Sequence, residues 1–242
     1  MSRNGNGSGG EGMNNGLHCE KCRDMGYVLT EQDGVEVAVR CECYEKRMAL
    51  IRMKNSGIPE EFSKKGFQDF ETMGISSLET AKQKAEMYCG NFRKIESDRQ
   101  NSIIFCGQPG SGKTHLGMAI CNSLLNACNV PVSYMAYRNA VTVIKQTVTS
   151  KEDYYAAINQ YCTTRLLYID DLLKGRTTDA DTNILYEIVN YRYMHSKPII
   201  ISTEKLPAAL VDFDEAVGSR ILEMCRGNII QLQGKELNYR LN

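Results

Sequence analysis

A glycine-rich stretch at residues 107–114 constrains the fold of this chain more than any other feature. It reads GQPGSGKT and fits the phosphate-binding P-loop pattern G-x-x-x-x-G-K-[ST]. An apolar run precedes it at 103–106, and Leu116, Ile120 and Leu124 follow it at intervals of four residues. This pattern predicts a buried strand before the loop and a helix after it. The sequence therefore predicts an α/β fold built around a phosphate site.

The residue types in this loop suit polyphosphate binding. The glycines let backbone N–H groups turn toward the phosphates, and the following helix adds the positive end of its dipole. Lys113 is expected to reach the β- and γ-phosphates, and the Thr114 hydroxyl to ligate Mg²⁺. The predicted nucleotide-binding residues of the loop are Gly107, Pro109, Gly110, Ser111, Gly112, Lys113 and Thr114.

An acidic pair follows the apolar run at 166–169. Asp170 and Asp171 stand at the end of this predicted strand. Downstream of a P-loop, an acid-tipped strand indicates a Walker B motif rather than a strand that merely ends in solvated carboxylates. We expect Asp170 to hold Mg²⁺ and Asp171 to orient or deprotonate the attacking water.

Two further polar positions come later in the chain. Thr203 and Glu204 end another apolar strand, at the edge where open α/β sheets place ligand-contacting groups. Arg220 follows a glycine and a serine in a helical stretch. A surface salt bridge is the alternative role for this arginine.

Two close pairs of cysteines mark the N-terminal region. These cysteines are Cys19, Cys22, Cys41 and Cys43. The strand-like runs between the pairs, at 27–30 and 35–39, flank Asp33 and Gly34, which predicts a β-hairpin with a tight turn. Such spacing is typical of a four-cysteine Zn²⁺ site, with an iron–sulfur cluster or free thiols as the alternatives. We expect metal to supply the folding energy of this small ribbon.

Composition limits the class of protein. Lysine and arginine together number 29, equal to the 29 acidic residues. The chain therefore has no overall positive charge that would indicate nucleic-acid binding. No apolar run approaches the length of a membrane span, and no signal region is evident, which favours a cytoplasmic protein without membrane contact. We expect a disordered tail at 1–16, a zinc ribbon with a connecting helix at 17–56, and an ATPase domain at 57–242.

The order of these motifs resembles that of the AAA+ ATPases. A closer similarity is to the replicative helicase loaders of the DnaC/DnaI type, especially those of phages and Gram-positive bacteria. The short segments that carry this resemblance are DDL at 170–172, NYRY at 190–193, ISTE at 201–204, GSR at 218–220 and NYR at 238–240. The resemblance extends over nearly the whole chain from residue 17, because that family also contains an N-terminal cysteine ribbon.

The resemblance implies a fold and a set of roles. The fold is a P-loop AAA+ core with a five-stranded parallel sheet flanked by helices, a small N-terminal zinc ribbon and no helical lid. Thr203 or Glu204 would sense the γ-phosphate, with Thr203 favoured because a carboxylate would repel phosphate. Arg220 would be an arginine finger that reaches the ATP of a neighbouring protomer, and Arg240 would be a second sensor. The implied catalytic residues are Asp171, Thr203 and Arg220.

The function implied is ATP-dependent loading of the replicative DNA helicase during DNA replication. Its cofactors would be ATP, Mg²⁺ and Zn²⁺, and its partners the helicase, other copies of the chain and single-stranded DNA. Tyr134, Tyr137, Arg138 and Lys145 are the candidate DNA contacts. Asp171 stands where many AAA+ proteins have glutamate, so ATP hydrolysis should be slow. The alternatives are a transposition helper ATPase of the IstB type and a nucleotide-switched adaptor with little hydrolysis.

Overall fold

The computed structural model describes residues 19–32 and 34–239. The predicted tail at 1–16 and Arg240 lie outside the described residues. The chain divides into two compact units, one up to Lys54 and one from Asn55 onward. No helix in the described ranges is both long enough and apolar enough to cross a membrane.

The N-terminal unit contains an antiparallel hairpin. Strands β1 (Tyr27–Gln32) and β2 (Val35–Arg40) pair from Tyr27 opposite Arg40 to Gln32 opposite Val35. The register leaves two residues for the turn, and Gly34 has a φ of +77°, which glycine adopts without strain. Leu29 and Val35 remain largely exposed, so the hairpin buries little apolar surface. Helix α1 (Tyr44–Ser56) follows it and runs to the boundary between the units.

A five-stranded parallel sheet forms the centre of the larger unit, as the sequence predicts. Its strand order is β4-β5-β6-β3-β7, and every neighbouring pair is parallel. The strands are β3 (Ile103–Gly107), β4 (Val132–Ala136), β5 (Leu166–Leu172), β6 (Ile199–Thr203) and β7 (Ile229–Leu232). Strand β3, which leads into the glycine-rich loop, is therefore buried between β6 and β7.

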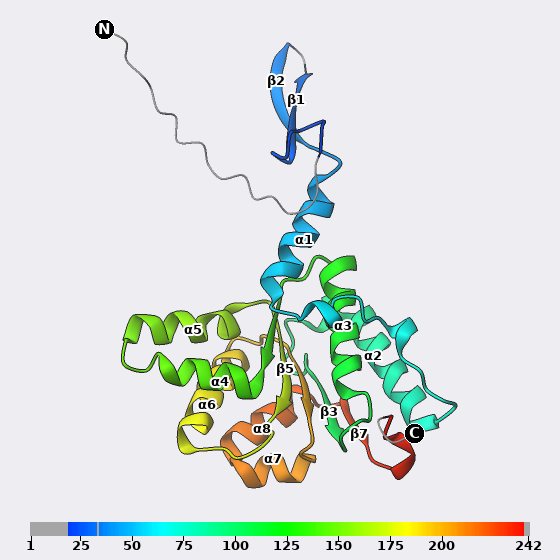
Figure 1. Cartoon of the computed structure of the whole chain (residues 1–242), viewed down its shortest axis with the longest axis vertical. Helices are drawn as coiled ribbons and strands as arrows, with labels where there is room; N and C mark the ends of the chain where they lie inside the picture. Colours follow the sequence, from blue (N-terminus) through cyan, green and yellow to red (C-terminus); the bar gives the residue numbers. More distant parts are fainter. Residues whose placement is uncertain (1–18, 33, 240–242) are drawn as a thin grey trace. The chain divides into compact units, whose positions relative to one another are not determined.

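Helices cover both faces of this sheet (Figure 1). Helices α2 (Ser76–Ile95) and α3 (Lys113–Ala127) pack together on one face. The helices of the other face are α4 (Tyr137–Gln146), α5 (Lys151–Thr163), α6 (Asp179–Met194), α7 (Pro207–Phe213) and α8 (Glu215–Met224). Short 3₁₀ helices lie at Glu60–Phe62, Phe67–Asp69 and Lys235–Leu237. Among the described residues, the last of these is the only helix that follows β7.

Alternating side chains of the central strands fill two apolar cores. Ile104 and Cys106 of β3 join the core beneath α4–α8. Ile103 and Phe105 are equally buried and alternate with them, so they point toward α2 and α3. Burial on both faces requires the continuous apolar runs by which these strands are recognised in the sequence.

One arginine joins several elements inside this fold. Arg192 of α6 is fully buried, and its guanidinium donates to five backbone carbonyls. These acceptors are the carbonyl oxygens of Tyr161, Cys162, Thr164, Arg165 and Pro198, at 2.7–3.4 Å. The side chain thus satisfies the end of α5 and the entry to β5 and β6 together.

Candidate functional site

The glycine-rich loop joins the end of β3 to the start of α3. Gly112, which precedes the helix, has a φ of +81°, and a Cβ there would lie 2.5 Å from the ring of Phe70. Gly110 has a φ of +77°, and its Cβ would lie 2.1 Å from Oδ1 of Asn238. Both the backbone conformation and the close neighbours require glycine at these positions.

Lys113 lies within the loop that precedes it. Its side chain is buried, and its Nζ donates to the carbonyl oxygen of Gln108 at 2.5 Å. Burial lowers the pKa of Lys113, whereas the carboxylates of Glu204 and Asp171 act in the opposite direction. The ammonium is therefore near two carboxylates whose negative charge it partly neutralises.

Asp170 accepts hydrogen bonds from four hydroxyl groups. Its Oδ1 accepts from Thr114 at 2.9 Å, from Tyr168 at 2.7 Å and from Ser202 at 2.5 Å. Its Oδ2 accepts from Tyr134 at 3.0 Å. The structure thus brings together the two predicted Mg²⁺ ligands, the Thr114 hydroxyl and the Asp170 carboxylate. A carboxylate next to a hydroxyl is a donor set that suits this cation.

Asp171 leaves the regular line of β5. The pairing of β5 with β6 shifts register between Ile169 and Leu172, and Asp171 has a φ of +55° at this irregularity. A bulge of this kind re-aims a side chain. The Asp171 carboxylate forms an ion pair with Lys174 at 2.8 Å, and Lys174 also lies 3.8 Å from the carboxylate of Glu204.

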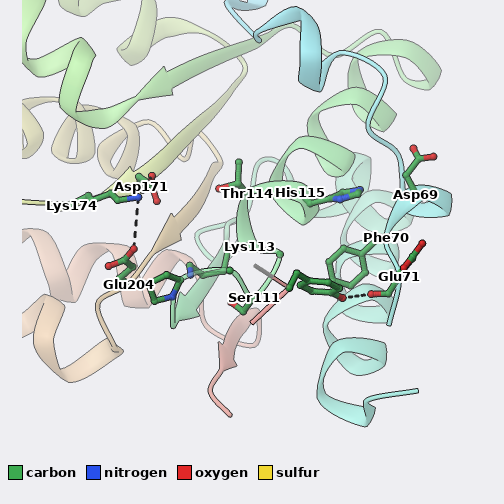
Figure 2. A pocket seen from close by; sticks show the side chains of 14 residues that line it. Asp69, Phe70, Glu71, Ser111, Lys113, Thr114, His115, Asp171, Lys174 and Glu204 are labelled. Carbon is green, nitrogen blue, oxygen red and sulfur yellow. Dashed lines mark hydrogen bonds and ion pairs between the residues drawn. The ribbon is translucent and has the colours of Figure 1, made fainter. Parts of the chain in front are cut away.

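These groups face a cavity of about 360 Å³ (Figure 2). Its lining residues are Asp69, Phe70, Glu71, Pro109, Gly110, Ser111, Gly112, Lys113, Thr114, His115, Asp171, Lys174, Glu204 and Tyr239. Figure 2 shows the ion-paired Lys174 and Glu204 at one end and the segment of Phe70 at the other. The predicted loop residues from Pro109 to Thr114 therefore share one cavity with Asp171, whereas Gly107 and Asp170 are not among its lining residues.

An aromatic group, which the sequence patterns did not indicate, forms the second end of the cavity. Phe70 packs edge-on against His115, with ring centroids 5.3 Å apart, and against Tyr239 at 6.2 Å. The Tyr239 hydroxyl donates to the carbonyl of Glu71, and its backbone N–H donates to Gly110 at 3.0 Å. Phe70 is buried and Tyr239 half-buried, so this end of the cavity is lined by aromatic groups that can contribute apolar contacts to a nucleobase.

Glu204, rather than Thr203, lines the cavity. Thr203 is fully buried, and its hydroxyl donates to the carbonyl of Leu172 at 2.7 Å and accepts from the backbone N–H of Lys205 at 3.0 Å. We expected Thr203 to sense the γ-phosphate, but its side chain is not among those that line the cavity. The hydroxyl is engaged in fixing the turn after β5.

Arg220 lies outside the lining of this cavity. Its Nη1 donates to the carbonyl of Ala216 at 2.7 Å, and its guanidinium lies 5.5 Å and 5.4 Å from the ring centres of Tyr186 and Tyr193. A role at the nucleotide of its own chain does not fit this position. The arrangement leaves a role at a neighbouring copy as the proposal to test.

The tyrosines predicted to contact DNA are packed into the protein. Tyr137 is buried, and the Tyr134 hydroxyl is held by the carboxylate at the end of β5. Lys145 pairs with Asp181 at 2.6 Å, while Arg138 is exposed. Neither ring is an open stacking platform, because Tyr137 is part of the core beneath α4–α8 and the Tyr134 ring packs against Tyr168, with centroids 5.6 Å apart. DNA contact through this set stays a prediction that its geometry does not favour.

The four N-terminal cysteines converge as their spacing predicts. The sulfurs of Cys19, Cys22, Cys41 and Cys43 all lie within 4.8 Å of one another. The sulfurs of Cys19 and Cys41 are 3.7 Å apart, and those of Cys22 and Cys43 are 3.4 Å apart. Zinc–sulfur bonds of about 2.3 Å give a tetrahedron with edges of roughly 3.8 Å, so these sulfurs fit such an ion.

Hydrogen bonds also favour a thiolate in this cluster. Burial raises the pKa of Cys22, but the backbone N–H of Gly26, at 3.3 Å, and the Cys43 thiol outweigh it and lower that pKa to about 7. A thiolate is the form that binds metal. The cluster is therefore chemically able to hold a metal ion.

The sequence of this chain matches the model of a known ATPase family. The model of the bacterial DnaA ATPase domain matches residues 69–226. The match spans most of the larger unit and begins in the segment that carries Phe70.

Individual proteins agree with that match. The phage-like element PBSX protein XkdC of Bacillus subtilis is 37% identical over 231 residues, which cover 92% of this chain and 86% of XkdC. The replicative helicase loader DnaC of Escherichia coli is 26% identical over 220 residues, which cover 86% of this chain and 84% of DnaC. The crystal structure of DnaI superimposes with a TM-score of 0.60 at 17% identity, covering 73% of this chain and 95% of DnaI.

Proposed function

Because the chain belongs to the bacterial DnaA ATPase-domain family and is of the DnaC/DnaI type, we propose that it is an ATP-dependent loader of a replicative DNA helicase. The observation that carries the ATPase part is the cavity in which the glycine-rich loop, the acidic end of β5 and the aromatic Phe70 meet. The loading part rests on the similarity to DnaC.

Each group of the cavity has a role in the proposed reaction. The loop amides and Lys113 bind the β- and γ-phosphates, and the rings of Phe70 and Tyr239 take the base. Thr114 and Asp170 would hold Mg²⁺, which neutralises charge on the phosphates when bound. Asp171 accepts the proton of the attacking water. Its carboxylate is one methylene shorter than that of the glutamate often found there, which supports slow hydrolysis.

We further propose that Arg220 acts on the nucleotide of a neighbouring copy. Its position outside the lining of its own cavity supports action between chains rather than within one. A guanidinium placed against the γ-phosphate stabilises the charge that spreads during transfer. Hydrolysis would then depend on self-association of the chain. We also propose a cytoplasmic location and contact with single-stranded DNA, although the two tyrosines predicted for that contact are packed into the protein.

The N-terminal unit is proposed to hold Zn²⁺ and to bind the helicase. Four thiolate ligands leave no open position for substrate, so a structural role is favoured over a catalytic one. The metal would fix the ends of a hairpin that buries little apolar surface by itself. A rigid, largely exposed hairpin is a suitable docking surface for another protein.

Replacement of Cys22 by serine is expected to lower zinc from about one ion per chain to nearly none, because structural zinc sites need all four ligands. Elemental analysis of the purified full-length chain measures this, and visible absorbance identifies an iron–sulfur cluster if one is present instead. Cys89→Ser is the matched control, because Cys89 lies on α2 outside the cluster. Equal zinc in both variants would contradict the site.

The loading function is tested by binding to the purified replicative helicase of the host. The chain should form a stable complex with the helicase, and Cys22→Ser should weaken that complex while ATP binding persists. Size-exclusion chromatography of the mixture, with and without ATP, measures both effects. No complex in either condition would exclude the loader, and ATP binding without turnover would favour a nucleotide-switched adaptor.

A further inference from the structure

Two carboxylates line the end of the cavity at which we propose that the phosphates bind. Their negative charge is unfavourable for an anionic ligand. Asp171 and Glu204 both line the cavity, and the side chain of each is more than one third exposed. Glu204 is one of the two sensor candidates that the resemblance implies, and it is the charged one. Like charges repel, so an uncompensated pair would weaken the binding of a γ-phosphate.

Lys174 is placed to balance these two carboxylates. Its Nζ lies 2.8 Å from Oδ2 of Asp171 and 3.8 Å from Oε1 of Glu204, and Figure 2 shows it beside Asp171 with a dashed line to Glu204. Lys113, the second ammonium of the cavity, is held by the carbonyl of Gln108 within the loop. The two lysines therefore approach the cavity from different elements.

A short, well-defined turn determines where Lys174 lies. The backbone N–H of Lys174 donates to the carbonyl of Asp171 at 3.1 Å, and the buried Thr203 hydroxyl holds the carbonyl of Leu172. Gly175 follows with a φ of +86°, where a Cβ would lie 2.6 Å from the guanidinium of Arg138. The backbone of the turn is thus fixed at several points. Movement of the ammonium is left to the flexible side chain of Lys174, whose exposed fraction is 46%.

We propose that Lys174 is the residue by which this cavity distinguishes ATP from ADP, and that its ion pair with Asp171 is a latch that the γ-phosphate opens. This inference rests on the proposed ATPase function. The third phosphate adds an anion next to Lys113 and Thr114, and that anion competes with Asp171 for the ammonium of Lys174. Once Lys174 turns to the phosphate, the Asp171 carboxylate is free to act on water. ADP lacks the competing group and leaves the ion pair in place.

The proposal predicts a selective loss of affinity. Lys174→Met should weaken binding of AMPPCP, a non-hydrolysable ATP analogue, by about tenfold, because one charge-assisted contact is lost. Binding of ADP should change by less than about twofold, since that contact is absent with ADP. Lys174→Arg, which keeps the charge, should retain most of the preference. Isothermal titration calorimetry of the full chain with each nucleotide and Mg²⁺ measures these constants.

The latch makes a second, less obvious prediction. Asp171→Asn removes the partner that competes for Lys174, so it should tighten AMPPCP binding by about threefold. The same substitution made together with Lys174→Met should give a smaller gain, because only repulsion and no competition is then removed. Such non-additivity is the signature of coupling between the two side chains. Equal gains in the two backgrounds would overturn the latch.

The matched control is Lys205→Met, which removes an exposed lysine close in sequence that does not line the cavity. It should leave both affinities unchanged. If Lys174→Met lowered the affinities for AMPPCP and ADP equally, or lowered neither, the proposed role of Lys174 would be overturned. The proposed ATPase function would not be affected by that result. Failure of the unmodified chain to bind either nucleotide would instead overturn the proposed function and this inference with it.

Discussion

Replacement of Lys113 by alanine is expected to weaken ATP binding by about hundredfold while the protein stays folded. The ammonium is the buried cation of the glycine-rich loop, and its charge-assisted contacts to phosphate are worth about 3 kcal/mol, or about hundredfold in Kd. The fold should survive, because the Gln108 carbonyl that Lys113 contacts also accepts from the Ser111 hydroxyl at 2.9 Å. Calorimetric titration with AMPPCP gives the affinity, and circular dichroism with thermal unfolding reports the fold.

Arg220→Ala provides the comparison for Lys113→Ala. Arg220 lies outside the lining of the cavity, so its removal should leave the affinity for AMPPCP unchanged. Under conditions where the chain self-associates, the same variant should lose ATP hydrolysis. Wild-type affinity in Lys113→Ala would show that the cavity is not the nucleotide site.

Replacement of Arg192 by methionine is expected to lower the free energy of unfolding of the larger unit by about 3–5 kcal/mol. Methionine is apolar and long enough to fill much of the space, but it supplies no donor. The five carbonyls that Arg192 satisfies would then be buried without it. A loss of this size corresponds to a fall in Tm of roughly 10 °C for a unit of this length.

Urea unfolding followed by circular dichroism measures the effect of Arg192→Met. Arg226→Met is the matched control, because Arg226 is exposed and should tolerate the change within about 0.5 kcal/mol. A loss below about 1 kcal/mol for Arg192→Met would mean that water or neighbouring groups replace the guanidinium at those carbonyls.

The parts of the site that depend on local chain order were predictable from sequence. The glycine-rich loop, with Lys113 and Thr114, requires a strand before it and a helix after it, and both leave short-range apolar patterns. Asp170 and Asp171 follow a buried strand for the same reason. The convergence of two cysteine pairs likewise follows from a hairpin that connects them. These features need no knowledge of how distant segments pack.

Other parts depend on contacts between distant segments. Phe70 and Tyr239 are far apart in sequence and meet only because both chain segments cross the loop. Thr203 is turned from the cavity by the hydrogen bond of its hydroxyl to the Leu172 carbonyl of β5, a contact between distant segments that single-sequence patterns do not show. The sequence is equally compatible with Tyr134 as a stacking platform and as a packed ring. The hydrogen bond of its hydroxyl to Asp170, which decides between the two, is visible only in the structure.

The four hydroxyls around Asp170 also have a mechanical consequence. They come from α3, β4, β5 and β6, so this single carboxylate ties one helix to three adjacent strands. Sliding any of these elements against another would break a buried hydrogen bond. The sheet beneath the phosphates should therefore behave as a stiff frame. Any motion linked to nucleotide turnover would then be confined to parts that are held less firmly, such as the exposed side chain of Lys174.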